Sequence, residues 1–174
     1  RTLEIQYIWD TESQSFVPYY KDEYSYDENG NRTLEIQYIW DTESQSFVPY
    51  YKDEYSYDEN GNRTLSIFYQ WDTESQSLVP YYKEESSYDE NGNRTLYMNY
   101  DWDTESQSFV SNYKDEYSYD ENGNRTLYIF YQWDTESQSF VPSSKREYSY
   151  DENGNQTLYI FYQWDTESQS FVPY

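Results

Sequence analysis

A fixed period of 31 residues constrains this chain more than any other feature of its sequence. The run WDTESQS occurs without a change in all six units, and YDENGN without a change at all five junctions. Such self-similarity indicates an array in which each unit is one supersecondary element packed on its neighbours. We predict a single repeat array over residues 1–174, with units 1–31, 32–62, 63–93, 94–124 and 125–155 and a partial unit 156–174.

The stretches between the constant runs have the chemistry of strands. Residues 32–40 alternate large apolar side chains with others, a period of two that is typical of a strand. Residues 47–57 are rich in tyrosine and carry Pro49 near their start, where a strand or a bulge tolerates proline. The predicted fold class is all-β: tandem 31-residue β-hairpin repeats that form a continuous antiparallel meander. An open sheet of about ten strands needs cover, so we expect it to be coiled or paired into a superhelix or fibre.

The pair Asn29-Gly30 permits two hairpin turns. A two-residue type I′ loop is one, and a three-residue loop with a type I turn and a left-handed Gly30 is the other. The second turn places the large apolar residues on one face of the sheet. A shift of the strand register by one residue would move each of them to the opposite face. We therefore expect positive φ at Gly30 and Asp27 opposite Asn31.

The same register assigns a role to each face of the sheet. It predicts Tyr24 opposite Leu34 and, across a six-residue loop, Trp40 opposite Phe47. The constant Leu, Ile, Tyr and Trp side chains then share one face, which we expect to be the buried one, whereas the variable face tolerates looser packing. Acidic or basic residues such as Asp22 fall on the aromatic face in this register. We expect a bulge to turn them outward.

Composition excludes several functions. There is no cysteine and no histidine, which removes thiol chemistry, disulfides and the usual proton shuttle. A net charge of −23 opposes binding to nucleic acid or anionic membranes. We see no apolar run long enough for membrane insertion and no signal sequence, and we expect the chain to be a section of a longer array. A repeating sheet offers identical exposed carboxylates and no singular cleft, so we predict that the protein is not an enzyme.

Two polar segments are candidate sites. The acidic turn beginning at Asp27 has oxygen ligands of the kind calcium prefers, but it lacks the spacing of a calcium loop, so a hairpin turn is the favoured interpretation and no cofactor is expected. The turn also contains Asn-x-Thr acceptors for N-glycosylation, at Asn31, Asn62, Asn93, Asn124 and Asn155. The other loop offers hydroxyls for O-glycosylation, at Thr11, Thr42, Thr73, Thr104, Thr135 and Thr166.

The run YDENGNRT resembles the YD repeat of Rhs-type and teneurin-like proteins, whose repeats build spiralling β-sheets that can form a shell. A second resemblance is to tandem arrays in secreted surface proteins of Bacteroidetes-type bacteria. The matching residues are Trp40-Asp41, Val48-Pro49 and Lys52, with Phe47 where that family usually has tryptophan. This resemblance implies an extracellular or cell-surface location and no catalytic residue.

These observations leave three functions open. The first is a secreted structural protein, tyrosine-rich and acidic, that self-associates into a fibre, stalk or filament and carries covalent glycans. The second is an adhesive or glycan-binding module that uses exposed aromatic rows. The third is a segment of a YD-type shell.

Overall fold

A computed structural model describes residues 1–174 and confirms the all-β meander. Twelve antiparallel strands follow one another in chain order in one open sheet. The strands are β1 (Thr2–Asp10), β2 (Ser15–Tyr26), β3 (Arg32–Asp41), β4 (Ser46–Tyr57), β5 (Arg63–Asp72), β6 (Ser77–Tyr88), β7 (Arg94–Asp103), β8 (Ser108–Tyr119), β9 (Arg125–Asp134), β10 (Ser139–Tyr150), β11 (Gln156–Asp165) and β12 (Ser170–Pro173).

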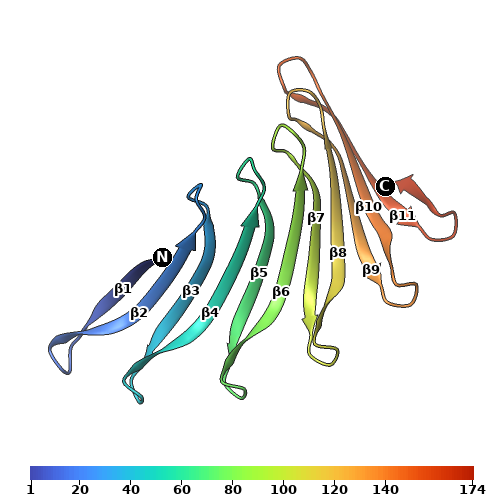
Figure 1. The fold of residues 1–174 in the computed structure, drawn as a ribbon. Coiled ribbons are helices and arrows are strands. Elements are labelled where there is room, and N and C mark those ends of the chain that lie inside the picture. Colours follow the sequence, from blue (N-terminus) through green and yellow to red (C-terminus); the bar gives the residue numbers. More distant parts are fainter. The chain divides into compact units, whose positions relative to one another are not determined.

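The chain divides into two compact segments, an N-terminal segment (Arg1–Lys83) and a C-terminal segment (Glu84–Tyr174). Within each segment, successive hairpins lie side by side (Figure 1). In each segment, the YDENGN turns are at one edge of the sheet, where one set of strand ends lies, and the WDTESQS loops are at the other. Within a segment, every repeat unit therefore presents the same two polar connections at the same two edges.

The predicted three-residue turn is confirmed. The Gly30 amide donates to the Asp27 carbonyl at 3.2 Å, and the Asp27 amide donates to the Asn31 carbonyl at 2.9 Å. Gly30 has a φ of +88°, and Asn29 does not have positive φ. This is a type I turn closed by a left-handed residue, the position at which glycine is favoured because it has no Cβ.

Replacing Gly61 with alanine is expected to lower the free energy of unfolding by about 1–2 kcal/mol, the cost of a left-handed backbone at a residue with a Cβ. Space is not the cause, because the nearest atom to the added Cβ would be Asn31 Oδ1 at 3.7 Å. Urea denaturation measures the change. Glu59→Ala, at an exposed position of the same turn, is the control, and an equal loss in both variants would contradict the backbone explanation.

The WDTESQS loop is shorter than predicted. Trp40 does pair with Phe47, and their rings meet edge to face with centroids 5.1 Å apart. However, Asp41 also pairs with Ser46, so the loop is 42–45 and not six residues long. Gln45 has positive φ, +52°, and reverses the chain there.

Two bulges per repeat unit overturn the predicted register along the middle of the strands. Tyr26 pairs with Arg32 but Ser25 pairs with Leu34, so Thr33 is an extra residue. Tyr24 consequently faces Glu35, and the prediction that it faces Leu34 is wrong. A second bulge inserts Tyr50 beside Pro49, because Gln37 pairs with Tyr51 and Tyr38 pairs with Pro49. Each bulge exchanges the faces of the residues that follow it.

The two faces of the sheet consequently carry other sets of side chains than the predicted register placed there. In β3, Leu34, Ile36, Tyr38 and Trp40 share a face with Lys52 and Glu54 of β4; we name it the Lys-Glu face. Glu35 and Gln37 share the other face with Tyr51, Asp53 and Tyr55, and we name it the Tyr-Asp face.

Neither face has a hydrophobic core. No hydrophobic side chain is buried, and the buried residues, Asp22 (4% exposed), Ser66 (5%) and Asp115 (9%), all lie on the Tyr-Asp face. The expectation that the constant apolar face is the buried one is therefore wrong. Bulges do move Asp22 off the face of the Leu, Ile, Tyr and Trp side chains, as expected, because Asp22 pairs with Gln37. However, its side chain is buried on the other face and is not turned outward to solvent. Gln37 Nε2 donates to Asp22 Oδ1 at 2.9 Å, which compensates the carboxylate for its burial.

Candidate functional site

A three-residue cluster on the Lys-Glu face links neighbouring repeat units. Lys52 Nζ lies 2.9 Å from Glu54 Oε1 on β4, and it lies 3.5 Å from the ring centroid of Tyr69 on β5. The Tyr69 hydroxyl donates to Glu54 Oε2 at 2.8 Å, which closes the triangle. We call this arrangement the Lys-Glu-Tyr clamp. It combines an ion pair, a cation–π contact and a charge-assisted hydrogen bond across a unit junction.

The same clamp recurs in the C-terminal segment. Tyr131 donates to Glu116 at 2.8 Å beneath Lys114, whose Nζ is 4.0 Å from the ring centroid. Further along, Tyr162 donates to Glu147 at 2.7 Å, and Lys145 Nζ is again 4.0 Å from the ring. Because the geometry repeats at junction after junction, the clamp is a property of the repeat and not of one sequence variant.

The ionisation of the clamp residues reflects their burial and their partners. Burial of the Tyr69 hydroxyl and its hydrogen bond to Glu54 raise the pKa of Tyr69 to about 12. Burial alone would raise the pKa of Glu54, but hydrogen bonds from Lys52 and Tyr69 hold that pKa below its usual value. The carboxylate is therefore charged and the phenol neutral at physiological pH, which is the state that the clamp requires.

Sequence reasoning did not identify the clamp, although the signal was present. The lysine and the glutamate are constant in all five complete units, as Lys21, Lys52, Lys83, Lys114 and Lys145 and as Glu23, Glu54, Glu85, Glu116 and Glu147. The incorrect register had separated them from the constant tyrosine of the next unit.

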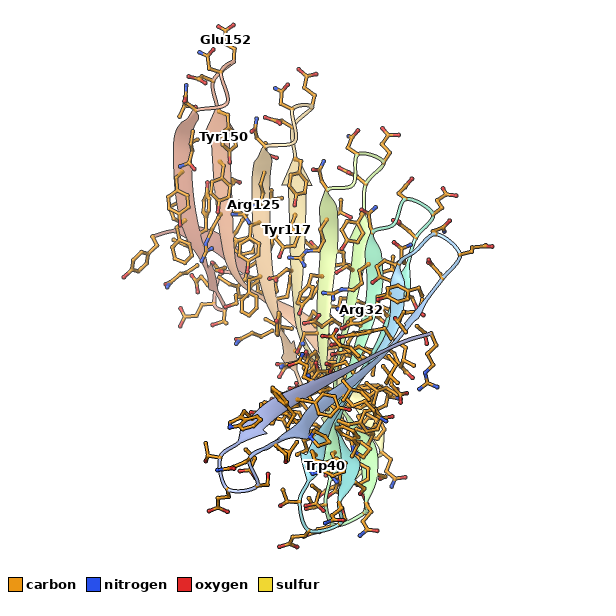
Figure 2. All side chains as sticks on the ribbon, turned by 90° about the vertical axis from the view of Figure 1, so that its left-hand side faces the viewer. Arg32, Trp40, Tyr117, Arg125, Tyr150 and Glu152 are labelled. Atoms are coloured by element: carbon orange, nitrogen blue, oxygen red, sulfur yellow. The ribbon has the colours of Figure 1, made fainter.

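On the Tyr-Asp face, arginines stack between tyrosines of adjacent units. The Arg32 guanidinium lies 5.6 Å from the ring centroid of Tyr24 and 5.5 Å from that of Tyr55. Figure 2 shows Arg125 beside Tyr117, and their guanidinium-to-centroid distance is 6.0 Å. In the same view Trp40 marks the loop end of β3, opposite Arg32 at its turn end. These stacks join units on the second face, near the turns.

Asp115 and Arg146 occupy equivalent positions on this face, but their side chains differ in hydrogen bonding. The Asp115 carboxylate accepts hydrogen bonds from the hydroxyls of Tyr128, at 2.8 Å, and Tyr117, at 3.2 Å. Arg146 Nε is buried without a hydrogen-bond partner. Its guanidinium lies over the rings of Tyr128 and Phe161 instead.

The acidic turn uses its carboxylate internally. Asp27 Oδ1 accepts from the amides of Asn29 and Asn31, and Asp27 Oδ2 accepts from Asn31 Nδ2 at 3.0 Å. The side chain therefore organises the turn. No group of three or more acidic side chains is arranged to hold a metal ion. These hydrogen bonds account for the constant Asp and Asn of the turn.

The predicted sugar acceptors are in two different environments. The amide nitrogen of Asn31, the atom that N-linked sugar would modify, donates to Asp27, and the side chain is half-buried. The loop threonines, for example Thr42, are exposed at the opposite edge of the sheet. Figure 2 shows Glu152 extending from the tip of a turn, which marks the negatively charged rim beside the Asn acceptors.

Acidification below about pH 4 is expected to lower the thermal stability of the protein. Hydrogen bonds, first from the side chain of Asn31, hold the pKa of Asp27 below its ordinary value of 3.8, and the same effect occurs at all five turn aspartates. Side-chain and backbone hydrogen bonds likewise lower the pKa of all six loop aspartates. For a carboxylate with a lowered pKa, the stabilisation is complete above its unfolded pKa and is lost as the pH falls through the folded one.

Asp53 acts in the opposite direction, because burial and the nearby Glu35 raise its pKa, so its protonation favours the folded state. Melting temperatures measured from pH 6 to pH 2 test the balance. A continuous rise in melting temperature down to pH 2 would show that relief of charge repulsion outweighs the turn and loop hydrogen bonds.

The fold and these contacts define a tandem β-hairpin repeat protein, tyrosine-rich and acidic, in which side chains clamp each unit to the next. No family model matches the sequence, and no curated protein matches it. In fold, the chain is similar to a protein of unknown function from Bacteroides fragilis, with a TM-score of 0.59 and 19% identity over 74% of this chain and 91% of that one. At this identity the likeness establishes a shared fold.

Two weaker similarities have TM-scores below one half. One is to a DUF3836 family protein from Bacteroides vulgatus (TM-score 0.42, 19% identity, 52% of this chain and 89% of that one). The other is to a TcdB2-TccC3 structure (TM-score 0.41, 14% identity, 92% of this chain and 9% of that one). The structure has no helix of the length and apolar character needed to cross a membrane.

Proposed function

We propose that this protein is an extracellular structural repeat protein whose units build a fibre, stalk or filament. The observation that carries the proposal is the Lys-Glu-Tyr clamp, which joins neighbouring units at three junctions with the same three side chains. A contact that repeats from junction to junction suits a protein that serves as an elongated structural element. It concentrates no singular chemistry at one place.

The pattern of burial supports the same function. No unit buries a hydrophobic side chain by itself. The apolar side chains of β1, which has no strand before it, are more exposed than their copies in β3. Leu3, Tyr7 and Trp9 are 61%, 54% and 54% exposed, whereas their copies Leu34, Tyr38 and Trp40 are half-buried beside the preceding unit. Burial is thus supplied by stacking, as in other quasi-one-dimensional repeat proteins.

Charge supports assembly in one direction. The net charge of −23 includes the acidic turns, which line one edge of the sheet, and the aspartate and glutamate of the loops, which line the other (Figure 1). Like charges on both edges oppose side-by-side bundling. Extension by hairpin pairing remains favourable, since the strands supply backbone hydrogen bonds and clamps. Glycans on the loop threonines or turn asparagines would add to this separation.

The proposed location outside the cell, at or near the surface, rests on the sequence resemblance to secreted repeat arrays. The shared fold with a Bacteroides fragilis protein is compatible with it. Self-association of copies is the proposed partner interaction.

Electron microscopy and light scattering of the purified chain over a range of concentrations test the assembly. We expect elongated particles that grow with concentration and an axial repeat of about 9.6 Å or a multiple of it, the width of two strands. Tyr69→Phe combined with Glu54→Gln removes one clamp and should shorten the particles, whereas Glu59→Gln at an exposed turn should not. Compact monomers at every concentration would refute the assembly.

Mass spectrometry of protein isolated from its native source tests the sugar separately. Peptides covering Asn31 and Thr42 should carry hexose-type additions, and enzymatic deglycosylation should increase bundling. Unmodified peptides at both positions would refute glycosylation and leave the assembly proposal standing.

A further inference from the structure

The hairpins separate from one another near the WDTESQS loops, which opens a groove between repeat units. Strands β4 and β5 pair from Tyr57 and Arg63 only as far as Tyr51 and Gln70, so the loop-side ends of both strands have no partner across the junction. A groove of about 450 Å³ lies there. It is lined by Ile39, Val48 and Tyr50 on one side and by Gln70, Trp71 and Thr73 on the other.

An aromatic surface continues from this groove along the Tyr-Asp face. The Tyr50 ring meets Tyr51 edge to face with centroids 5.9 Å apart, and Tyr51 lies 5.8 Å from Phe68. Phe68 in turn lies 6.1 Å from Tyr81. The row of rings is therefore continuous from Tyr50 to Tyr81, over neighbouring units of the N-terminal segment.

The tyrosines one period apart in this row are accessible to a ligand. Tyr19, Tyr50 and Tyr81 are 42%, 50% and 59% exposed. Tyr19 and Tyr50 are the bulge residues of their hairpins, where an extra residue leaves the regular ladder and re-aims its side chain. A bulge at this position places an aromatic ring at the groove instead of packing it within the sheet.

The polar groups at the groove favour a neutral ligand. Asp41 borders the groove, but its carboxylate accepts hydrogen bonds from the Ser44 hydroxyl and from the amides of Ser44 and Glu43, and these bonds hold the pKa of Asp41 below its usual value. Gln70 and Thr73, both exposed, remain as neutral donors and acceptors. The net charge of −23 opposes acidic ligands. A cation would meet Asp41 at the groove, but the carboxylate of Asp41 already accepts hydrogen bonds within its own loop. Flat apolar rings beside neutral hydrogen-bonding groups match the apolar face and hydroxyl rim of a sugar.

We propose that Tyr19, Tyr50 and Tyr81, with the groove beside Tyr50, bind a neutral, linear, β-linked glycan that runs across the strands. The repeat pitch is about 9.6 Å, twice the strand spacing, which accommodates roughly two sugar rings of an extended chain per unit. Each unit would then stack one ring on its tyrosine, and Gln70, whose counterparts are Ile8 and Ile39 in the first two units, would hydrogen-bond a neighbouring hydroxyl at the groove. The site is independent of the assembly proposed above, since it uses neither the clamp nor the strand edges.

The sequence supplies an internal comparison. In the C-terminal segment, Asn112 and Ser143 stand at the bulge position in place of tyrosine. Asn112 Nδ2 donates to Asp101 Oδ2 at 2.8 Å, so this copy uses the position for a local hydrogen bond. Serine at this position in an otherwise regular hairpin shows that the fold tolerates the loss of the ring.

The test is isothermal titration of the whole chain with soluble oligosaccharides of β-linked glucose and of β-linked N-acetylglucosamine, with a polygalacturonate oligosaccharide and choline as charged comparisons. The double variant Tyr50→Ser/Tyr81→Ser copies the natural residue of the fifth unit and should weaken binding of the neutral oligosaccharide by roughly five- to tenfold or more. Tyr26→Ser is the matched control, because Tyr26 is 48% exposed and lies at the other edge of the sheet. It should bind as the parent chain does.

Binding of a neutral oligosaccharide that the double variant weakens and the control retains supports the proposal. Three results would overturn it: no binding of either neutral oligosaccharide at millimolar concentration, binding that the double variant leaves unchanged, or binding of choline or polygalacturonate alone. Circular dichroism of each variant verifies that the sheet is intact, and none of these results depends on whether the chain forms fibres.

Discussion

Trp133→Ala is expected to lower the free energy of unfolding by about 2 kcal/mol. Truncating a fully buried tryptophan costs about 3–5 kcal/mol, and Trp133 is only half-buried, so we expect roughly half of that loss. The Trp133 ring meets the Phe140 ring edge to face, with centroids 5.0 Å apart. Lys114 Nζ, from β8 of the preceding unit, lies 5.5 Å from the Phe140 ring centroid. The variant therefore removes a ring contact that the neighbouring unit covers.

Urea denaturation followed by circular dichroism measures this loss against two controls. Gln132→Ala, at an exposed position next in sequence, should change stability by less than about 0.5 kcal/mol. Trp9→Ala removes the same type of ring pair, with Phe16 at 5.2 Å, but Trp9 is 54% exposed and should cost clearly less than Trp133. Equal losses at Trp9 and Trp133 would show that cover from the preceding unit contributes nothing.

Asp115→Ala and Arg146→Asp are expected to change stability in opposite directions. Asp115 is 9% exposed and accepts from two tyrosine hydroxyls, and hydrogen bonds to a charged group contribute about 1.5–3 kcal/mol. Its loss should therefore destabilise the protein by about 2 kcal/mol. The fall should be smaller in Asp115→Asn, which retains an acceptor.

Arg146→Asp should stabilise the protein by about 1 kcal/mol. The rings of Tyr148 and Tyr159 lie 5.5 Å apart, and those of Tyr117 and Tyr128, which hold Asp115, lie 5.4 Å apart. An aspartate at 146 would thus find two hydroxyl donors already in place, and the unpartnered Nε of arginine would be removed. A loss of stability in Arg146→Asp would show that stacking of the guanidinium on Tyr128 and Phe161 outweighs the hydrogen bonds.

The elements that were predicted correctly depend on local chemistry. The turn, its left-handed Gly30 and the pairing of Trp40 with Phe47 were predicted correctly because they depend on residues next to each connection, although the parity used to choose the turn holds only as far as the bulge at Thr33. The period was sufficient for the order of strands.

The assignment of faces failed because it assumed one uninterrupted alternation and one buried side. The bulges at Thr33 and Tyr50 each insert one extra residue, which reverses the alternation of side chains between the two faces, and the sequence pattern does not reveal this insertion. Tyrosine occurs on both sides of the sheet, so polarity did not reveal the error. The clamp was missed for the same reason, whereas the constancy of Lys52 and Glu54 would have indicated a shared contact independently of register.

The confinement of the clamp to adjacent units bears on how such a gene can change. A duplication or deletion of 31 codons brings both bulges, one turn, one loop and one set of clamp residues, so each remaining junction keeps its contacts. The first two units are identical in sequence, as expected of a duplication that preserved every interaction. Recombination between copies can therefore alter the reach of the protein in steps of about 9.6 Å without selecting a new fold. A deletion of one codon within a strand would instead exchange the two faces beyond it.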